Sequence, residues 1–173
     1  MDAEQERELT ALSRQGDRAA YAGLVRAHSG RVFAICLGML GNRHDAEDAA
    51  QQTLLRGFVQ IQGLRDSDRF APWIARIARN LCLDTIRRSR RRVAPMPRSE
   101  CDEGARTEDC RRLEAALAKL DSEYRVPLLL FYFDGRNTRS IAETLGATPA
   151  AIQTRLSRGR RQLRTLLTAE GGE

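Results

Sequence analysis

Apolar residues recur at helical spacing along almost the whole chain, and no segment of useful length alternates as a β-strand would. The dipeptides Gly16-Asp17 and Gly41-Asn42 interrupt this pattern, and each combines a turn-forming glycine with a residue that caps helices. We therefore expect a helix to end before each pair and another to begin after it. The helix that follows the second pair has an apolar face made of Ala46, Ala49, Ala50, Leu54, Phe58 and Ile61. The sequence predicts an all-α fold.

A longer interruption separates the two halves of the chain. Residues 93–107, VAPMPRSECDEGART, contain two prolines, one glycine and mixed charges, a composition typical of a linker. Helical spacing resumes over 108–133, and two further helices are expected over 137–167. We therefore expect two small helical domains, residues 1–92 and 108–173, joined by a flexible linker at 93–107.

The clearest motif lies in the second half, in NTRSIAETLGATPAAIQTRLSRGRRQLRTLL. Asn137 or Thr138 can cap a first helix, and Gly146 supplies the left-handed residue that ends it. Thr148 and Pro149 then suit the start of a second helix. The apolar face of the pair comprises Ile141, Ala142, Leu145, Ile152, Leu156, Gly159, Leu163 and Leu166. This pattern is typical of a DNA-binding helix-turn-helix, and the alternative is an ordinary helical hairpin with a basic, solvated face.

A second basic helix is expected in RFAPWIARIARNLCLDTIRRSRRR, residues 69–92, from about Pro72. Its apolar face comprises Ile74, Ile77, Ala78, Leu81 and Thr85. Trp73, the only tryptophan, falls on the opposite face with Arg76, Asn80 and Arg87. An aromatic ring beside a basic groove suits unpaired bases, so Trp73 is a candidate for packing under a single strand or bracing the adjacent loop. Alternatively Trp73 packs against its own domain, because tryptophan is usually largely buried.

Positive charge is concentrated in two separate blocks of a chain whose net charge is +6. Residues 64–98 carry ten arginines and three acidic residues, and residues 137–173 carry six arginines and three acidic residues. The segment between them, 99–136, is acidic. Two basic blocks favour two nucleic-acid contact sites on one chain, although an arginine-rich solvated surface would look similar.

Several other classes of protein are disfavoured. No apolar run approaches the roughly 18 residues of a membrane span, and the acidic N-terminus MDAEQERELT does not resemble a signal peptide. We therefore expect a cytoplasmic protein that makes no membrane contact by itself. No phosphate-binding glycine loop and no cluster of metal ligands or catalytic residues is present, so we expect no enzyme, no cofactor and no metal. Both histidines, His28 and His44, are expected at the surface.

The four cysteines show no C-x-x-C spacing. They are Cys36, Cys82, Cys101 and Cys110. We interpret them as buried or unreactive thiols of a cytosolic protein. A redox or metal role is the alternative, with Cys101 and Cys110 as the more reactive pair.

Two motif groups occur in an order that resembles a known family. DAEDAAQQTLLRGF, FAPWIARIARNLCLDTIRR and then LEAALAKLDSEYRVPLLLFYFDGRNTRSIAETLGATPAAIQTRLSRGRRQL are similar to the extracytoplasmic-function (ECF, group IV) sigma factors of bacterial RNA polymerase, over about residues 19–167. The resemblance implies that residues 1–92 are sigma region 2, which binds core polymerase and reads and opens the −10 promoter element. It implies that residues 108–173 are sigma region 4, which reads the −35 element.

The resemblance also implies partners and site residues. The partners are core RNA polymerase (through the clamp helices of its largest subunit and its flap tip), promoter DNA, and an anti-sigma factor that holds the chain inactive until a stress signal. The −10 surface comprises Leu64, Asp66, Ser67, Trp73, Arg76, Asn80, Arg87 and Arg88; the family loop that captures a flipped base corresponds to residues 64–70. The −35 surface comprises Thr138, Gln153, Thr154, Arg155, Ser157, Arg158 and Arg161. The polymerase-binding surface comprises Asp45, Glu47, Asp48, Gln51, Gln52 and Leu55.

The polymerase-binding helix is expected to expose Thr53 and Arg56 along the same polar surface. Its acidic start has a second interpretation, because negative charge at a helix N-terminus is stabilised by the helix dipole. An alternative function for the whole chain is a stand-alone helix-turn-helix regulator that binds duplex DNA as a dimer. That function would need a dimerisation element, which no heptad run supplies, and it would leave the first basic block unused.

Overall fold

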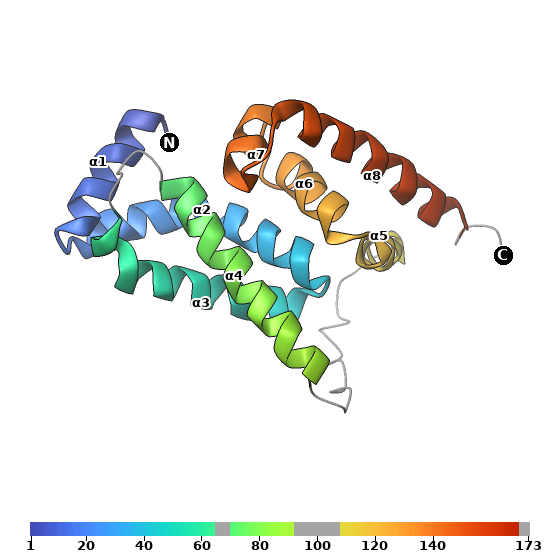
Figure 1. Ribbon diagram of the computed structural model, residues 1–173, viewed down its shortest axis with the longest axis horizontal. Coiled ribbons are helices and arrows are strands. Elements are labelled where there is room, and N and C mark those ends of the chain that lie inside the picture. Colours follow the sequence, from blue (N-terminus) through green and yellow to red (C-terminus); the bar gives the residue numbers. More distant parts are fainter. Residues whose placement is uncertain (65–69, 92–107, 170–173) are drawn as a thin grey trace.

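The computed structural model describes residues 1–64, 70–91 and 108–169, and these residues form helices without any strand (Figure 1). The elements in chain order are α1 (Ala3–Arg14), α2 (Arg18–Leu40), α3 (Arg43–Gln60), the short 3₁₀ helix η1 (Ile61–Gly63), α4 (Phe70–Arg91), α5 (Glu108–Lys119), α6 (Ser122–Tyr132), α7 (Thr138–Leu145) and α8 (Pro149–Ala169). The predicted all-α fold is confirmed. Within the described residues, no helix combines the length and the apolar character needed to cross a lipid bilayer.

The two glycine-containing breaks in the first half are confirmed, and side chains set them locally. Asp17 Oδ1 accepts hydrogen bonds from the backbone N–H groups of Ala19 and Ala20, at 2.8 and 3.0 Å, and so caps α2. Gly41 ends α2 in the left-handed conformation, with φ of 77°. Asn42 then caps α3 by accepting from the backbone N–H of Asp45 at 2.9 Å.

Helix α2 is the centre of the first half and packs against α1, α3 and α4. Tyr21 of α2 is buried, and its hydroxyl donates to the carbonyl of Leu54 in α3 at 2.6 Å. Burial raises the pKa of Tyr21 to about 12, so the hydroxyl stays a donor. Close packing at this point depends on Gly57, because a Cβ there would lie 2.6 Å from both the Tyr21 hydroxyl and Ile74 Cδ1 of α4.

The helical segment expected over 108–133 consists of two helices. α5 ends at Lys119 and α6 begins at Ser122. They are separate because Asp121 adopts the extended conformation of an N-cap residue while Leu120 lies in the core, where it is 3% exposed. α6 packs against α8, and Gly159 allows the approach, since a Cβ there would lie 2.9 Å from Leu128 Cδ1.

The two halves share one hydrophobic core. α6 lies against α2 and α7 lies against α4, so α5–α8 cover one side of the bundle formed by α1–α4 (Figure 1). The sequence predicted two helical domains but gave no indication that they pack together. The whole of the predicted linker, residues 93–107, lies outside the described residues, Cys101 included, so the proposed domain boundaries stay a prediction.

Candidate nucleic-acid interface

The turn between α7 and α8 is built as the motif predicts. Asn137 caps α7 by accepting from the backbone N–H of Ser140 at 2.9 Å. Gly146 ends α7 with φ of 64°, a left-handed conformation that suits glycine. Thr148 Oγ1 accepts from the backbone N–H of Ala151 at 3.2 Å and so caps α8. Three apolar residues fix the pair against the core because they are buried: Ile141, Ile152 and Leu156.

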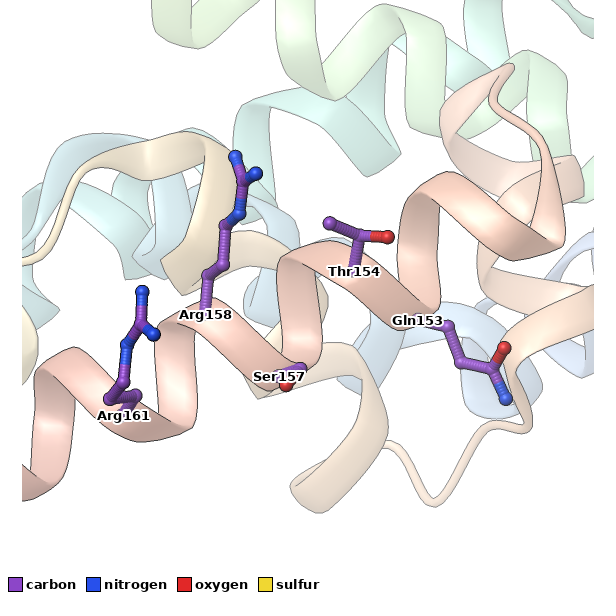
Figure 2. A pocket seen from close by; sticks show the side chains of 5 residues that line it. All are labelled: Gln153, Thr154, Ser157, Arg158 and Arg161. Atoms are coloured by element: carbon purple, nitrogen blue, oxygen red, sulfur yellow. The ribbon is translucent and has the colours of Figure 1, made fainter.

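The outer face of α8 is exposed and polar. Five side chains line an open hollow of about 530 Å³ along this face: Gln153, Thr154, Ser157, Arg158 and Arg161 (Figure 2). The side chains of Arg158 and Arg161 extend from the same side of the helix in Figure 2. Thr138 and Arg155, predicted with these five, are half-buried. The arrangement offers amide, hydroxyl and guanidinium groups that can bond to base edges and phosphates.

Arg160 occupies a different environment from the arginines beside it. Its guanidinium lies over the rings of Phe131 and Tyr132, 5.2 and 5.6 Å from their centroids. These distances are typical of cation–π contacts, so part of the positive charge of α8 contributes to packing on α6. The sequence alone did not indicate this contact, because its partners come from another helix.

The basic side of α4 is exposed beyond its first turns. Arg76, Asn80, Arg87 and Arg88 all face solvent, and Arg87 Nη1 lies 3.6 Å from Asp84 Oδ1 in an exposed i,i+3 pair. The predicted apolar face is confirmed, with Ile74, Ala78 and Leu81 buried. Asp66 and Ser67, predicted on the loop before α4, lie outside the described residues.

Trp73 does not share the exposure of these basic residues. Its side chain is half-buried against the core, and its ring centroid lies 5.7 Å from that of Phe70, which is fully buried. The helix begins at Phe70 rather than at Pro72, so its first turn is anchored in the interior. The helical-wheel placement of Trp73 on the basic face is therefore only partly right: the ring packs on Phe70 and the core as well.

Leu64 lies in the core and not on the −10 surface where it was expected. It is 7% exposed and belongs to the hydrophobic core, so its side chain offers almost no surface to DNA. Its burial follows from the single turn of η1, which brings Leu64 back beside the buried Ile61, whose carbonyl accepts from the Leu64 N–H at 3.0 Å. Leu64 and Phe70, the described residues on either side of 65–69, are thus both buried in the core.

One face of α3 combines charge with exposed apolar side chains. All six predicted polymerase-binding residues are exposed, Arg43 forms an ion pair with Glu47 at 2.7 Å on this face, and His44 Nε2 lies 3.9 Å from Asp48 Oδ2. Sequence reasoning missed Val59, which is 77% exposed, one helical turn beyond Leu55, which is 61% exposed. The sequence did contain a signal for this exposed apolar residue, because Val59 lies outside the predicted buried face of the helix.

Three expectations on burial were wrong. Thr53, expected on the polar surface of α3, is fully buried because it lies on the same helix face as the buried Ala49 and Gly57, and its hydroxyl is satisfied by the carbonyl of Ala49 at 2.7 Å. Phe58, expected in the buried face, is 38% exposed, although its ring lies 5.2 Å from that of Tyr21. His28, expected at the surface, is 2% exposed, because it packs beside Phe70 and Nε2 lies 3.3 Å from Glu6 Oε2.

The described cysteine side chains, Cys36 and Cys82, are buried neighbours in α2 and α4. A hydrogen bond with Cys82 and burial raise the pKa of the Cys36 thiol, which keeps it protonated. The side chain of Cys110 lies outside the described part of the structure. Groups of three or more metal-ligating side chains do not occur among the residues that the structure describes.

Comparisons with known proteins agree with this geometry. The family model for sigma-70 region 2 matches residues 24–92, and the model for sigma-70 region 4 matches residues 110–163. The ECF RNA polymerase sigma factor SigW of Bacillus subtilis is 31% identical, with 89% of this chain and 92% of SigW aligned. The ECF RNA polymerase sigma factor SigE of Mycolicibacterium smegmatis is 34% identical, with 91% of this chain and 66% of SigE aligned.

A solved structure extends the likeness to three dimensions. CnrH, determined in complex with the cytosolic domain of CnrY, superposes with a TM-score of 0.71 at 26% identity, covering 97% of this chain and 99% of CnrH. With both sigma regions matched in order, and relatives aligned over most of its length, the chain belongs to the ECF sigma factors, a family of transcription factors that bind RNA polymerase and promoter DNA.

Proposed function

We propose that this chain directs core RNA polymerase to promoters with paired −35 and −10 elements, with α8 reading the −35 element and α4 acting on the −10 element. The observation that carries the proposal is the exposed face of α8, on which Gln153, Arg158 and Arg161 are presented by a capped, core-anchored helix. Arginine and glutamine read base edges with two hydrogen bonds each. Anchoring in the core holds these groups at fixed positions for entry into a major groove.

On the −10 side, the exposed residues of α4 divide between two tasks. Asn80 is exposed, and its amide can pair with a base edge. Arg76, Arg87 and Arg88 are exposed along the same helix and suit phosphates of the opened strand. Trp73, half-buried beside Phe70, supports this surface from below. Asp66 and Ser67 are proposed to join them in capturing a flipped base.

Helix α3 is the proposed docking surface for the clamp helices of the largest polymerase subunit. Leu55 and Val59 supply exposed apolar area, and Asp45, Glu47 and Asp48 supply charge beside it. An apolar centre within a polar rim is typical of protein interfaces. In the second half, Tyr132 at the end of α6 is 66% exposed and is the proposed contact for the flap tip.

Charge reversal tests the α3 interface. Asp48→Arg combined with Gln51→Ala should weaken assembly with core polymerase by about tenfold or more, the loss of about 1.4 kcal/mol of binding free energy. The free energy of unfolding should change by no more than about 0.5 kcal/mol, because both side chains are exposed. Glu8→Arg, a charge reversal on α1, is the matched control and should assemble normally. Normal assembly with a large loss of stability would show instead that the acidic residues only stabilise the start of α3.

An anti-sigma factor is proposed to hold the protein inactive in the cytoplasm until a stress signal. Support comes from CnrH, which resembles this chain over nearly its full length and was determined bound to the cytosolic domain of CnrY. A complex of this kind would silence the chain without altering either reading surface.

Run-off transcription with core RNA polymerase tests the proposed function as a whole. The chain should start transcription only from templates that carry both elements, and binding to promoter DNA without polymerase should be weak and strongly salt-dependent. Nanomolar, sequence-specific binding to duplex DNA by the isolated chain, without support of transcription, would favour the stand-alone regulator.

A further inference from the structure

Helix α1 lies at the end of the bundle where α4 begins (Figure 1). It packs against α2, η1 and α4. Its approach to α2 depends on Gly23, because a Cβ built there would lie only 3.1 Å from Leu9 Cδ1. Thr10 and Ser13 of α1 are buried, and their hydroxyls donate to carbonyls of the same helix at 2.6 Å. The inner face of α1 is therefore closely packed in the first half of the chain.

Glu6 is the acidic residue at this inner face. Its side chain is 21% exposed, and its Oε2 lies 3.3 Å from Nε2 of His28, whose side chain is 2% exposed. The His28 ring lies in turn against Phe70, with 5.1 Å between the ring centroids. Phe70 is fully buried and is the first residue of α4. Glu6 of α1 and His28 of α2 thus meet where α4 begins.

The Glu6 carboxylate also contacts the backbone of α4. Burial alone would raise the pKa of Glu6, yet that pKa lies below its usual value. The charged form is stabilised by His28, by the charge of Arg31 and by a hydrogen bond from the backbone N–H of Ala71. The side chain is therefore an ionised acceptor at neutral pH, and one of its donors is the second residue of α4.

The start of α4 needs an acceptor from elsewhere in the fold. The first N–H groups of a helix have no intrahelical partner and carry partial positive charge. Arg69 precedes Phe70 in the sequence, and an arginine side chain has donors but no acceptor. It therefore cannot cap α4 as Asp17 caps α2. Glu6 supplies an acceptor from α1, together with the negative charge that stabilises a helix N-terminus.

The direction of α4 at its start determines where its exposed residues lie. Phe70 packs on Trp73, with 5.7 Å between the ring centroids, and the exposed Asn80 follows on the same helix. Asn80 is about 15 Å along the axis from Phe70, so a tilt of about 6° at the start would displace it by about 1.5 Å. Hydrogen bonds of good geometry occur over a range of only about 0.5 Å. Such a tilt would therefore remove the contact of Asn80 with a base edge.

We propose that Glu6 is a positioning residue for −10 reading: held by His28, it caps the start of α4 from α1 and so fixes the direction in which α4 presents Asn80. The proposal rests on the proposed function, because it requires that Asn80 reads a base of the −10 element. Glu6 acts through α4 and does not itself belong to the DNA surface. Since its contacts lie in α2 and α4, α8 should keep its own reading of the −35 element.

The fluorescence of Trp73, the only tryptophan, reports the start of α4 in the free full-length chain. Glu6→Ala should move the emission maximum to longer wavelength and increase quenching by acrylamide, because a loosened start of α4 exposes the ring. Glu6→Gln keeps an acceptor oxygen without the charge and should lie between Glu6→Ala and the wild type. Glu8→Ala is the matched control, since Glu8 is an exposed acidic residue of the same helix, and it should give the emission of the wild type.

Run-off transcription with core RNA polymerase then compares promoters that differ in one element at a time. Glu6→Ala should flatten the preference among −10 sequences by about fivefold, which is about 1 kcal/mol, the typical cost of losing a helix cap. The preference among −35 sequences should be that of the wild type in every variant. A smaller folded fraction would lower transcription from all promoters in the same proportion, so these preferences do not depend on how much of a variant is folded.

Three results would overturn the positioning role. If Glu6→Ala flattened the −10 and −35 preferences equally, Glu6 would support the fold as a whole. If the −10 preference survived Glu6→Ala, or fell while the emission of Trp73 stayed unchanged, Glu6 would not act on −10 reading through α4. Failure of the proposed function is visible separately, because the wild type would then support no run-off transcription, while the emission of Trp73 would still show whether Glu6 holds the start of α4.

Discussion

Helices α4 and α8 are both long, basic on one side and apolar on the other, yet they present their polar residues differently. Helix α8 is capped at its surface start by Thr148, and its polar face is open along several turns (Figure 2). Helix α4 starts inside the protein at Phe70, and its second turn carries the half-buried Trp73. Its exposed polar side chains begin only at Arg76.

The difference suggests two modes of DNA contact. A helix that is open along one face can enter the major groove of an intact duplex as a rigid body. A helix whose first turns are anchored in an aromatic cluster can hold a loop and a single strand at a fixed position while the duplex opens. Substitutions in the two helices test this division.

Trp73→Ala should have the largest effect, because it removes a ring that packs on Phe70 and the core. We expect a loss of about 3 kcal/mol in the free energy of unfolding, measured by denaturant titration. Trp73→Phe, which keeps a ring in this place, should lose much less. Normal stability in Trp73→Ala, with failure only in permanganate detection of melted thymines, would mean that the ring works on the open strand and that α4 and α8 differ less than proposed.

Arg158→Ala should flatten the preference among −35 sequences by about 1–3 kcal/mol, because one bidentate contact to a base is lost. The measurement is run-off transcription from promoters that differ only in the −35 element. Unfolding free energy should hardly change, since the side chain is exposed. Arg164→Ala, at an exposed arginine of α8 outside the predicted surface, should keep the wild-type preference. If both variants flattened the −35 preference equally, the assignment of −35 reading to the face that carries Arg158 would be wrong.

Asn80→Ala should flatten the preference among −10 sequences, toward the lower end of the same range of about 1–3 kcal/mol, because a single amide is lost. The preference of this variant among −35 sequences should be that of the wild type, and this unchanged preference is the internal control. Were Asn80→Ala to weaken all promoters equally, Asn80 would be a contact to the backbone of DNA and the contrast with Arg158 would fail.

Arg87→Ala should have the smallest effect. It should weaken all promoters about equally and lower the slope of log affinity against log salt concentration by about one unit, as loss of one phosphate contact does. Its exposed pair with Asp84, at 3.6 Å, should contribute little to stability. The measurement is a salt titration of holoenzyme binding; an unchanged slope would exclude the phosphate contact.

Local signals predicted those parts of the fold that neighbouring residues determine. The helix breaks at Gly16 and Gly41 and the turn at Gly146 follow from caps and left-handed glycines, which act within a few residues. The exposed face of α8 follows from its amphipathic pattern. For this reason five of the seven side chains predicted in the second half lie together on one exposed face.

Features that depend on distant residues were missed. His28 is buried because Phe70 and Glu6 pack around it, and nothing within a few positions of His28 indicates either partner. Leu64 is buried because the turn of η1 brings it back beside the buried Ile61. In sequence Arg125 looks like one more solvated arginine, and only the carbonyl ends of α2 and α5 make it a buried contact. Burial that depends on distant residues can be recognised only once the tertiary structure is known.

Site-directed photo-crosslinking in the promoter-bound holoenzyme tests the division between α4 and α8 most directly. A photoreactive amino acid would replace Arg76 on α4 in one sample and Ser157 on α8 in another, and the crosslinked bases would be mapped. Crosslinks from position 157 should fall within the −35 duplex, and those from position 76 should fall within the opened −10 segment. Crosslinks from both positions to the same element would contradict the division between the two helices.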